Sequence, residues 1–116
     1  MAFDIKENLK KAFFSFIATD TTSCEESTDF PSTEAQIYFA EGLASKCVEI
    51  GLEDVKIDKY CYVTATLKAN TDKNTDTIGF ISHMDTSPDC SGRGIQVVVT
   101  ENYDGGELKL GTSDTV

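Results

Sequence analysis

The sequence predicts an α/β protein in which two N-terminal helices pack on a mixed β-sheet. The first observation is the helical spacing of apolar residues in two segments before residue 51. The second is the alternation of apolar and polar residues in segments beyond it, which is typical of strands. The third is a continuous apolar run, Ile78-Gly79-Phe80-Ile81, as expected for a strand buried on both faces. Because helices precede strands without a regular βαβ repeat, some strand pairs should be antiparallel.

The first helix is predicted to begin at Ile5. Asp4 followed by Glu7 is typical of a capping box at a helix start. The apolar residues at helical spacing form one face, made of Ile5, Leu9, Ala12, Phe13, Phe16 and Ile17. We expect this face to pack in the core. The polar segment 19–31 has no periodicity and is expected to be a loop that runs over the surface.

The second helix is predicted to start in Pro31-Ser32-Thr33-Glu34, where Ser32 or Thr33 can cap its first turn. Gly51 marks its end, because glycine readily adopts the left-handed conformation that terminates helices. The inner face is expected to consist of Ile37, Ala40, Ala44, Cys47 and Val48.

Four further segments are predicted as strands. Apolar and polar residues alternate at 55–57 and at 63–67, which indicates half-exposed strands. A valine-rich segment at 95–100 and a short segment at 107–110 complete the expected sheet. Gly105-Gly106 between them is typical of a hairpin turn.

Length and charge limit the class of function. The chain has 116 residues, the size of one domain, and its 20 acidic residues against 10 basic ones give a net charge of −10. This charge repels phosphate groups, so nucleic acids and anionic membranes are not expected as partners. No apolar run approaches the roughly 18 residues of a membrane helix, and residues 1–7 do not have the pattern of a signal peptide. We expect a cytoplasmic protein whose acidity serves solubility or, alternatively, a cation site.

The four cysteines are Cys24, Cys47, Cys61 and Cys90, and no two of them form the C-x-x-C pair of a zinc knuckle. In a cytosolic protein, free structural thiols are expected. Cys90 lies close in sequence to the single histidine, His83, so a small cysteine hydrolase is one hypothesis.

The residues that carry chemistry follow the apolar run. His83 and Asp85 lie at the C-terminal end of the predicted strand, where open α/β sheets bind ligands. The histidine can ligate a metal, and Asp85 can hydrogen-bond a neighbouring group and tune the site. Alone, a His-x-Asp pair is a weak signal. Nearby, Pro88-Asp89 is interpreted as a turn, and Arg93 as a solvated charge in a flexible glycine-containing turn.

The stretch from Ile78 to Gly92, which reads IGFISHMDTSPDCSG, resembles the metal-binding signature of the M20 family of zinc metallopeptidases. Residues 31–34 resemble the start of that family's second helix, and residues 101–106 with 110–111 resemble the segment after the signature. The likeness spans nearly the whole chain, in the same order. It is closer to the family's tripeptide aminopeptidases than to its carboxypeptidases.

The resemblance implies a two-zinc exopeptidase that releases the N-terminal residue from tripeptides. It implies that His83 ligates one zinc ion and that Asp85 stands in the place of the active-site aspartate, which orients the metal site. Members of the family are much longer, and their remaining ligands and general base lie downstream of the matched region. The resemblance therefore implies that residues 1–116 are the N-terminal portion of a zinc-peptidase catalytic domain, without its lid domain.

Such a fragment is expected to be inactive alone and not to hold zinc tightly. Its exposed sheet edges favour pairing between copies of the chain. The alternative hypothesis is a self-contained acidic binding module without catalysis, which the length and the charge would also suit.

Overall fold

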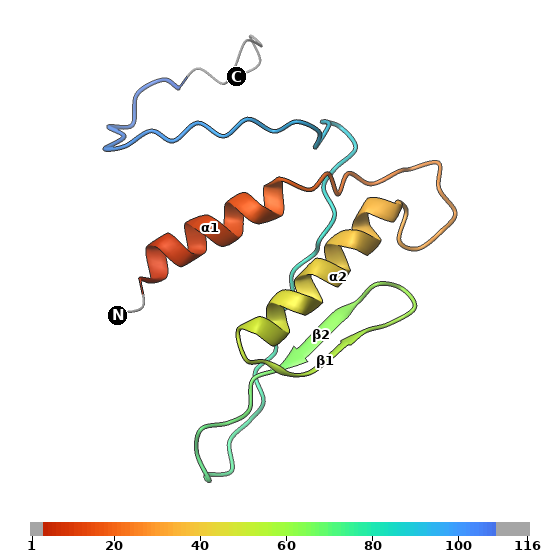
Figure 1. The fold of residues 1–116 in the computed structure, drawn as a ribbon, viewed down its shortest axis with the longest axis vertical. Coiled ribbons are helices and arrows are strands. Elements are labelled where there is room, and N and C mark those ends of the chain that lie inside the picture. Colours follow the sequence, from red (N-terminus) through yellow and green to blue (C-terminus); the bar gives the residue numbers. More distant parts are fainter. Residues whose placement is uncertain (1–3, 109–116) are drawn as a thin grey trace.

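The structure is a computed structural model, and it describes residues 4–108. Its regular elements are helix α1 (Ile5–Ile17), helix α2 (Glu34–Glu49), strand β1 (Glu53–Ile57) and strand β2 (Val63–Thr66). Figure 1 shows α2 lying between α1 and the two strands. The α/β class is thereby confirmed, with two helices followed by a sheet.

Helix α1 begins where the sequence predicts. The Asp4 carboxylate accepts a hydrogen bond of 3.1 Å from the backbone N–H of Glu7 and so caps the first turn. The expectation that α1 packs in the core is wrong for the part of the chain that the structure describes. No residue of α1 is buried there, and Phe13 is 58% exposed. Its aromatic contact with α2 is edge-to-face, between Phe16 and Phe39, with ring centroids 5.6 Å apart.

An apolar groove explains this exposure. It has a volume of about 830 Å³ and is lined by both helices, with Leu9 and Ala12 on one side and Leu43 on the other. Because the groove is open, the helices do not bury each other's apolar faces along their length. Among residues 4–108, α2 packs against β1 and β2 and α1 makes no comparable contact with them, so the prediction that both helices pack on the sheet is wrong for α1.

Helix α2 has the predicted ends. Thr33 is the N-cap residue, although its side chain makes no capping hydrogen bond. Ser32, the other predicted cap, instead accepts a hydrogen bond of 3.0 Å from the backbone N–H of Cys24. Gly51 follows the helix with φ of +88°, the left-handed conformation that glycine adopts without strain.

The inner face of α2 is only partly as predicted. Ala40 is buried, but Ile37 and Val48 are exposed. Gln36, one turn before Ala40, is buried as well and was not expected to be. Of the predicted inner face, the pattern therefore identified the buried Ala40 but not Gln36.

The two strands form an antiparallel pair. Ile57 is opposite Val63, and Glu53 is opposite Thr66. An ion pair between Glu53 and Lys68 lies at the same end. The strands predicted at 55–57 and 63–67 are thus confirmed, with the second ending at Thr66.

The mixed sheet is not formed among residues 4–108. The run 78–81, predicted as a buried strand, makes no strand pairing, and Phe80 is 96% exposed. Segment 95–100 and residues 107–108 make none either, while 109–110 lie outside the described residues. A strand needs a neighbour for its N–H and C=O groups, and β1 and β2 pair with each other. Parallel pairing in the described part is limited to one isolated bridge.

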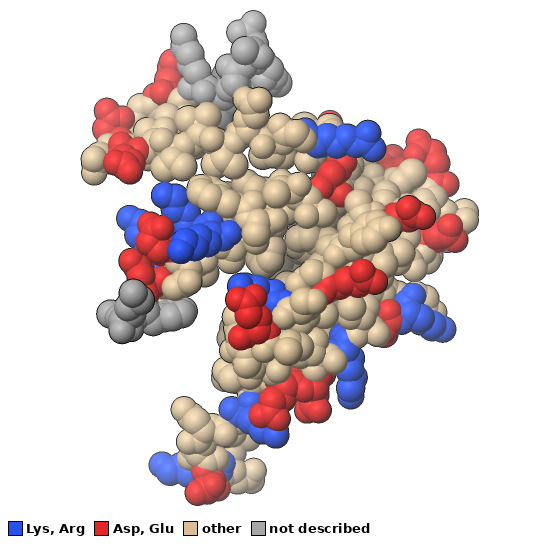
Figure 2. All heavy atoms as spheres, viewed as in Figure 1, with Lys and Arg blue, Asp and Glu red and all other residues tan. Residues whose placement is uncertain are grey.

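Few side chains are buried in the described part of the chain: Ala40, Cys61, Thr21 and Gln36. Between residues 4 and 108 there is no helix with the length and apolar character needed to cross a membrane. Figure 2 shows acidic side chains scattered among basic ones over the visible face, not gathered into one patch.

Candidate functional site

The polar loop after α1 lies alongside the segment that carries His83 and Asp85. Thr22 and Thr86 form the isolated parallel bridge. The backbone N–H of Ser23 donates to Thr86 O at 3.0 Å, and the N–H of Thr86 donates to Thr21 O at 3.2 Å. Thr21 is buried by this pairing, so the expectation of a loop that merely runs over the surface is wrong there. The bridge fixes the backbone immediately after Asp85.

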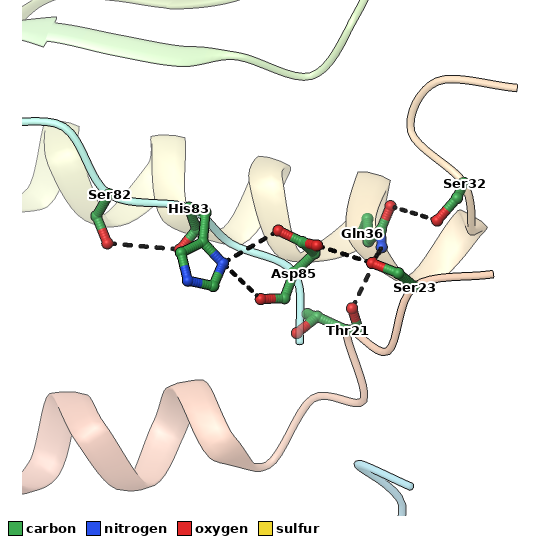
Figure 3. A network of polar contacts seen from close by, with 7 residues as sticks. All are labelled: Thr21, Ser23, Ser32, Gln36, Ser82, His83 and Asp85. Atoms are coloured by element: carbon green, nitrogen blue, oxygen red, sulfur yellow. Dashed lines mark hydrogen bonds and ion pairs between the residues drawn. The ribbon is translucent and has the colours of Figure 1, made fainter. Parts of the chain in front are cut away.

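His83 and Asp85 are in direct contact, as Figure 3 shows. Nδ1 of His83 lies 2.8 Å from the carbonyl oxygen of Asp85 and 3.1 Å from its Oδ1. A carbonyl and an ionised carboxylate only accept hydrogen bonds, so the proton of the neutral imidazole resides on Nδ1. Nε2 then carries the lone pair with which histidine binds metals. The His83 side chain is 83% exposed, which leaves Nε2 accessible in the described structure.

The Asp85 carboxylate is held on both of its oxygens. Oδ2 accepts a hydrogen bond of 2.8 Å from the hydroxyl of Ser23, while Oδ1 faces His83. The Ser23 hydrogen bond is the main cause that holds the pKa of Asp85 below its ordinary value of 3.8, with His83 acting in the same direction and partial burial opposing it. Asp85 is therefore ionised at neutral pH, as both contacts require.

Gln36 lies behind Ser23, in the first turn of α2 (Figure 3). Its Nε2 donates to Thr21 O at 3.2 Å and to Ser23 Oγ at 3.4 Å, and its Oε1 accepts from Ser32 Oγ at 3.4 Å. Neither Ser23 nor Gln36 is among the residues that the sequence predicts for the site. A signal existed for Gln36, because it is four residues before Ala40 and shares that residue's buried face.

A second group of contacts joins the loop to the turn after the site. Asp20 Oδ1 accepts hydrogen bonds from the hydroxyl and the N–H of Thr22, at 2.5 and 3.1 Å. Asp20 Oδ2 lies 3.1 Å from Nε of Arg93. The Arg93 side chain is 87% exposed, so it is a solvated charge as predicted, and it also forms an ion pair with Asp20 that was not expected. The N–H of Gly92 donates to Thr22 Oγ1 at 3.1 Å.

All four cysteines are free thiols, as predicted. Cys61 is buried, and burial, followed by the negative charges of Asp58 and Glu41, raises the pKa of its thiol. Cys90 is exposed. Across residues 4–108 no hydrogen bond joins Cys90 to His83, whose Nδ1 is engaged with Asp85 instead. The described geometry therefore does not assemble the pair that a cysteine hydrolase would need.

The described residues do not by themselves complete a metal site. No group of three or more His, Cys, Asp and Glu side chains placed to hold a metal occurs in the described range 4–108. A catalytic zinc ion needs three protein ligands and an open position. His83 offers one ligand atom, Nε2, and Asp85 supports the ring from Nδ1, as carboxylates commonly do for metal-binding histidines. The two side chains fit a contribution to a zinc site that other residues would complete.

Histidines that ligate metals usually donate their other ring N–H to a carboxylate, a backbone carbonyl or water, and His83 has contacts of this kind. No family model matches the sequence. Curated proteins named Peptidase T do match it. One from Caldanaerobacter subterraneus subsp. tengcongensis is 51% identical over 98 residues, which are 84% of this chain and 24% of that protein. Those from Halothermothrix orenii and Alkaliphilus oremlandii are 46% identical over 104 and 106 residues, in each case 90% of this chain and 26% of the relative.

The chain is similar to proteins named Peptidase T over most of its length, which confirms the likeness to tripeptide aminopeptidases seen in the sequence. It spans about a quarter of the length of the curated relatives that it matches. A match over 98 of 116 residues includes positions 19–98 wherever it begins. The region of likeness therefore contains His83 and Asp85, together with Ser23 and Gln36.

Proposed function

We propose that the chain is the N-terminal part of a zinc-dependent aminopeptidase that releases the N-terminal residue from tripeptides. The observation that carries the proposal is its 46–51% identity to proteins named Peptidase T over most of the chain. Membership of the M20 family and the use of zinc are supported by the resemblance of residues 78–92 to that family's metal-binding signature.

In this proposal His83 ligates one of two zinc ions through Nε2. Asp85 acts on the imidazole, because its carbonyl and carboxylate oxygens keep the proton on Nδ1 and so leave Nε2 free to bind. Bound zinc would supply Lewis acidity to the scissile carbonyl and lower the pKa of a water molecule. The remaining ligands and the general base would come from residues outside this chain, together with the lid domain.

The same proposal places the enzyme in the cytoplasm. Residues 1–116 alone would lack most of the metal ligands, so we propose that activity requires the full-length protein.

The test is to purify the full-length protein and to measure its zinc content and its release of alanine from trialanine. We expect hydrolysis that is lost on treatment with a chelator and restored by zinc. N-acetyl-trialanine, which lacks the free amino terminus, is the matched control and should not be cleaved. Trialanine hydrolysis that survives complete removal of metal, or no hydrolysis by the zinc-loaded protein, would contradict the proposal.

A further inference from the structure

We propose that Ser23 and Gln36 are positioning residues that orient Asp85, and through it His83, by a one-directional chain of hydrogen bonds. The inference rests on the proposed function, because it concerns the same histidine. It adds two residues from the loop and from α2 that the likeness to the M20 signature does not include.

The chain of hydrogen bonds begins at the side-chain amide of Gln36. Its amide orientation is fixed by the carbonyl oxygen of Thr21, which can only accept and therefore requires Nε2; Ser32 Oγ then donates to Oε1. Rotating the amide by 180° would bring its oxygen against the Thr21 carbonyl oxygen. Gln36 is 5% exposed, so water cannot easily replace a lost partner. The second amide hydrogen therefore points to Ser23.

Ser23 links Gln36 to Asp85, because its hydroxyl accepts from Gln36 and donates to Asp85. A hydroxyl has one proton to donate and lone pairs that accept. Because Ser23 Oγ accepts from Gln36 Nε2 at 3.4 Å, its own proton is left for Asp85 Oδ2, at 2.8 Å. The backbone of Ser23 is held at the same time by its N–H donation to Thr86 O. The hydroxyl thus starts from a fixed position and has one favourable orientation.

Asp85 in turn orients the imidazole ring of His83. With Oδ2 fixed by Ser23, the plane of the carboxylate is set, and Oδ1 lies 3.1 Å from Nδ1 of His83. Figure 3 shows the resulting line of contacts from Gln36 through Ser23 and Asp85 to His83. Without Ser23, Asp85 could rotate about its side-chain bonds, and the ring of His83 would lose one of its two Nδ1 partners. Support of this kind commonly changes metal affinity or activity by about 10- to 100-fold.

The experiment uses the full-length protein with zinc replaced by Co²⁺, whose visible absorption reports ligand geometry. We expect Ser23→Ala to alter the cobalt spectrum and to lower kcat for trialanine by about 10-fold or more, with little change in KM. Ser23→Thr, which keeps the hydroxyl, should restore both. Ser45→Ala is the matched control, because Ser45 is an exposed serine on α2 that donates to the carbonyl of Glu41.

Gln36→Met tests whether Gln36 acts through Ser23. We expect it to change the same cobalt spectrum, and we expect the double variant Ser23→Ala/Gln36→Met to match Ser23→Ala alone. If the two residues had independent structural roles, the free-energy effects of the two single substitutions would instead add in the double variant. If Ser23→Ala does not fold, the same measurements are made on Gln36→Met and Ser23→Thr. A cobalt spectrum that changes in Gln36→Met but not in Ser23→Thr supports the inference. Any other pattern overturns it.

The outcomes separate this inference from the proposed function. A wild-type enzyme that is active and binds cobalt, with an unchanged spectrum and kcat in a folded Ser23→Ala variant, overturns the inference and leaves the proposed function intact. Additive losses in the double variant overturn the role of Gln36. A wild-type protein that neither binds metal nor cleaves trialanine overturns the proposed function, and the inference with it.

Discussion

The carboxylate of Asp20 lies 3.1 Å from Nε of Arg93, and this contact ties the loop before α2 to the turn that follows the candidate site. Thr22 strengthens the link, because its hydroxyl and its N–H both donate to Asp20 and its hydroxyl also accepts from the N–H of Gly92. The hydrogen bonds from Thr22, and then Arg93, hold the pKa of Asp20 below its ordinary value of 3.8. The loop and the turn are therefore joined through Asp20 and Thr22, next to the Thr22–Thr86 bridge.

The link at Asp20 should weaken in acid. Because folding lowers this pKa, the stabilisation is fully present above the ordinary value of 3.8 and is lost as the pH falls through the lower value of the folded state. In thermal melts of the full-length protein, we expect the difference in Tm between wild type and Asp20→Asn to be largest near neutral pH and to shrink below about pH 4. Asp72→Asn, in an exposed polar segment, is the control. A Tm difference that grows in acid would contradict this assignment.

Gly92 should not tolerate a side chain. A Cβ placed there would lie 2.6 Å from Asp20 Oδ1 and 3.0 Å from Thr22 Oγ1, so the loop or the turn would have to move. We expect Gly92→Ala to lower the free energy of unfolding of the full-length protein by about 1–3 kcal/mol, as overpacking commonly does. Gly42→Ala is the matched control, because a Cβ there meets nothing within 4 Å. Equal unfolding free energies for Gly92→Ala and wild type, measured in denaturant, would show that the close approach is not real.

Residues 1–116 expressed alone should not unfold cooperatively. Apolar side chains such as Leu9, Phe80 and Ile81 are exposed, and the described part of the chain buries very few residues. We therefore expect strong binding of the dye ANS and a broad thermal transition by circular dichroism. The same polypeptide should bind zinc weakly and leave trialanine intact. A sharp two-state transition without dye binding would instead favour the alternative of a self-contained acidic module.

The elements that the sequence predicted correctly are those that local interactions determine. The cap of α1 needs only Asp4 and the N–H of Glu7, three residues away. The end of α2 needs a residue that adopts positive φ, which Gly51 provides. Strands β1 and β2 are neighbours along the chain and can pair with each other directly. The run at 78–81 is different, because a buried strand requires partners that sequence pattern does not identify.

The candidate site divides in the same way. His83 and Asp85 are two residues apart, and their contact follows from a short segment together with the family signature. Ser23 meets Asp85 across 62 residues of sequence, and nothing in the spacing of a single chain predicts that meeting. Gln36 is a polar residue on an otherwise apolar helix face, which was a usable sign of a buried hydrogen-bonding role.

The most direct test of the account is the replacement of His83 by alanine in the full-length protein, with metal analysis and trialanine hydrolysis measured on the same preparation. Because His83 Nε2 is proposed as a zinc ligand, we expect zinc to fall from about two ions per chain to one or fewer, and hydrolysis to fall below detection. The Ser45→Ala variant should keep both. A folded His83→Ala enzyme with two zinc ions and near-normal hydrolysis would contradict the central claim.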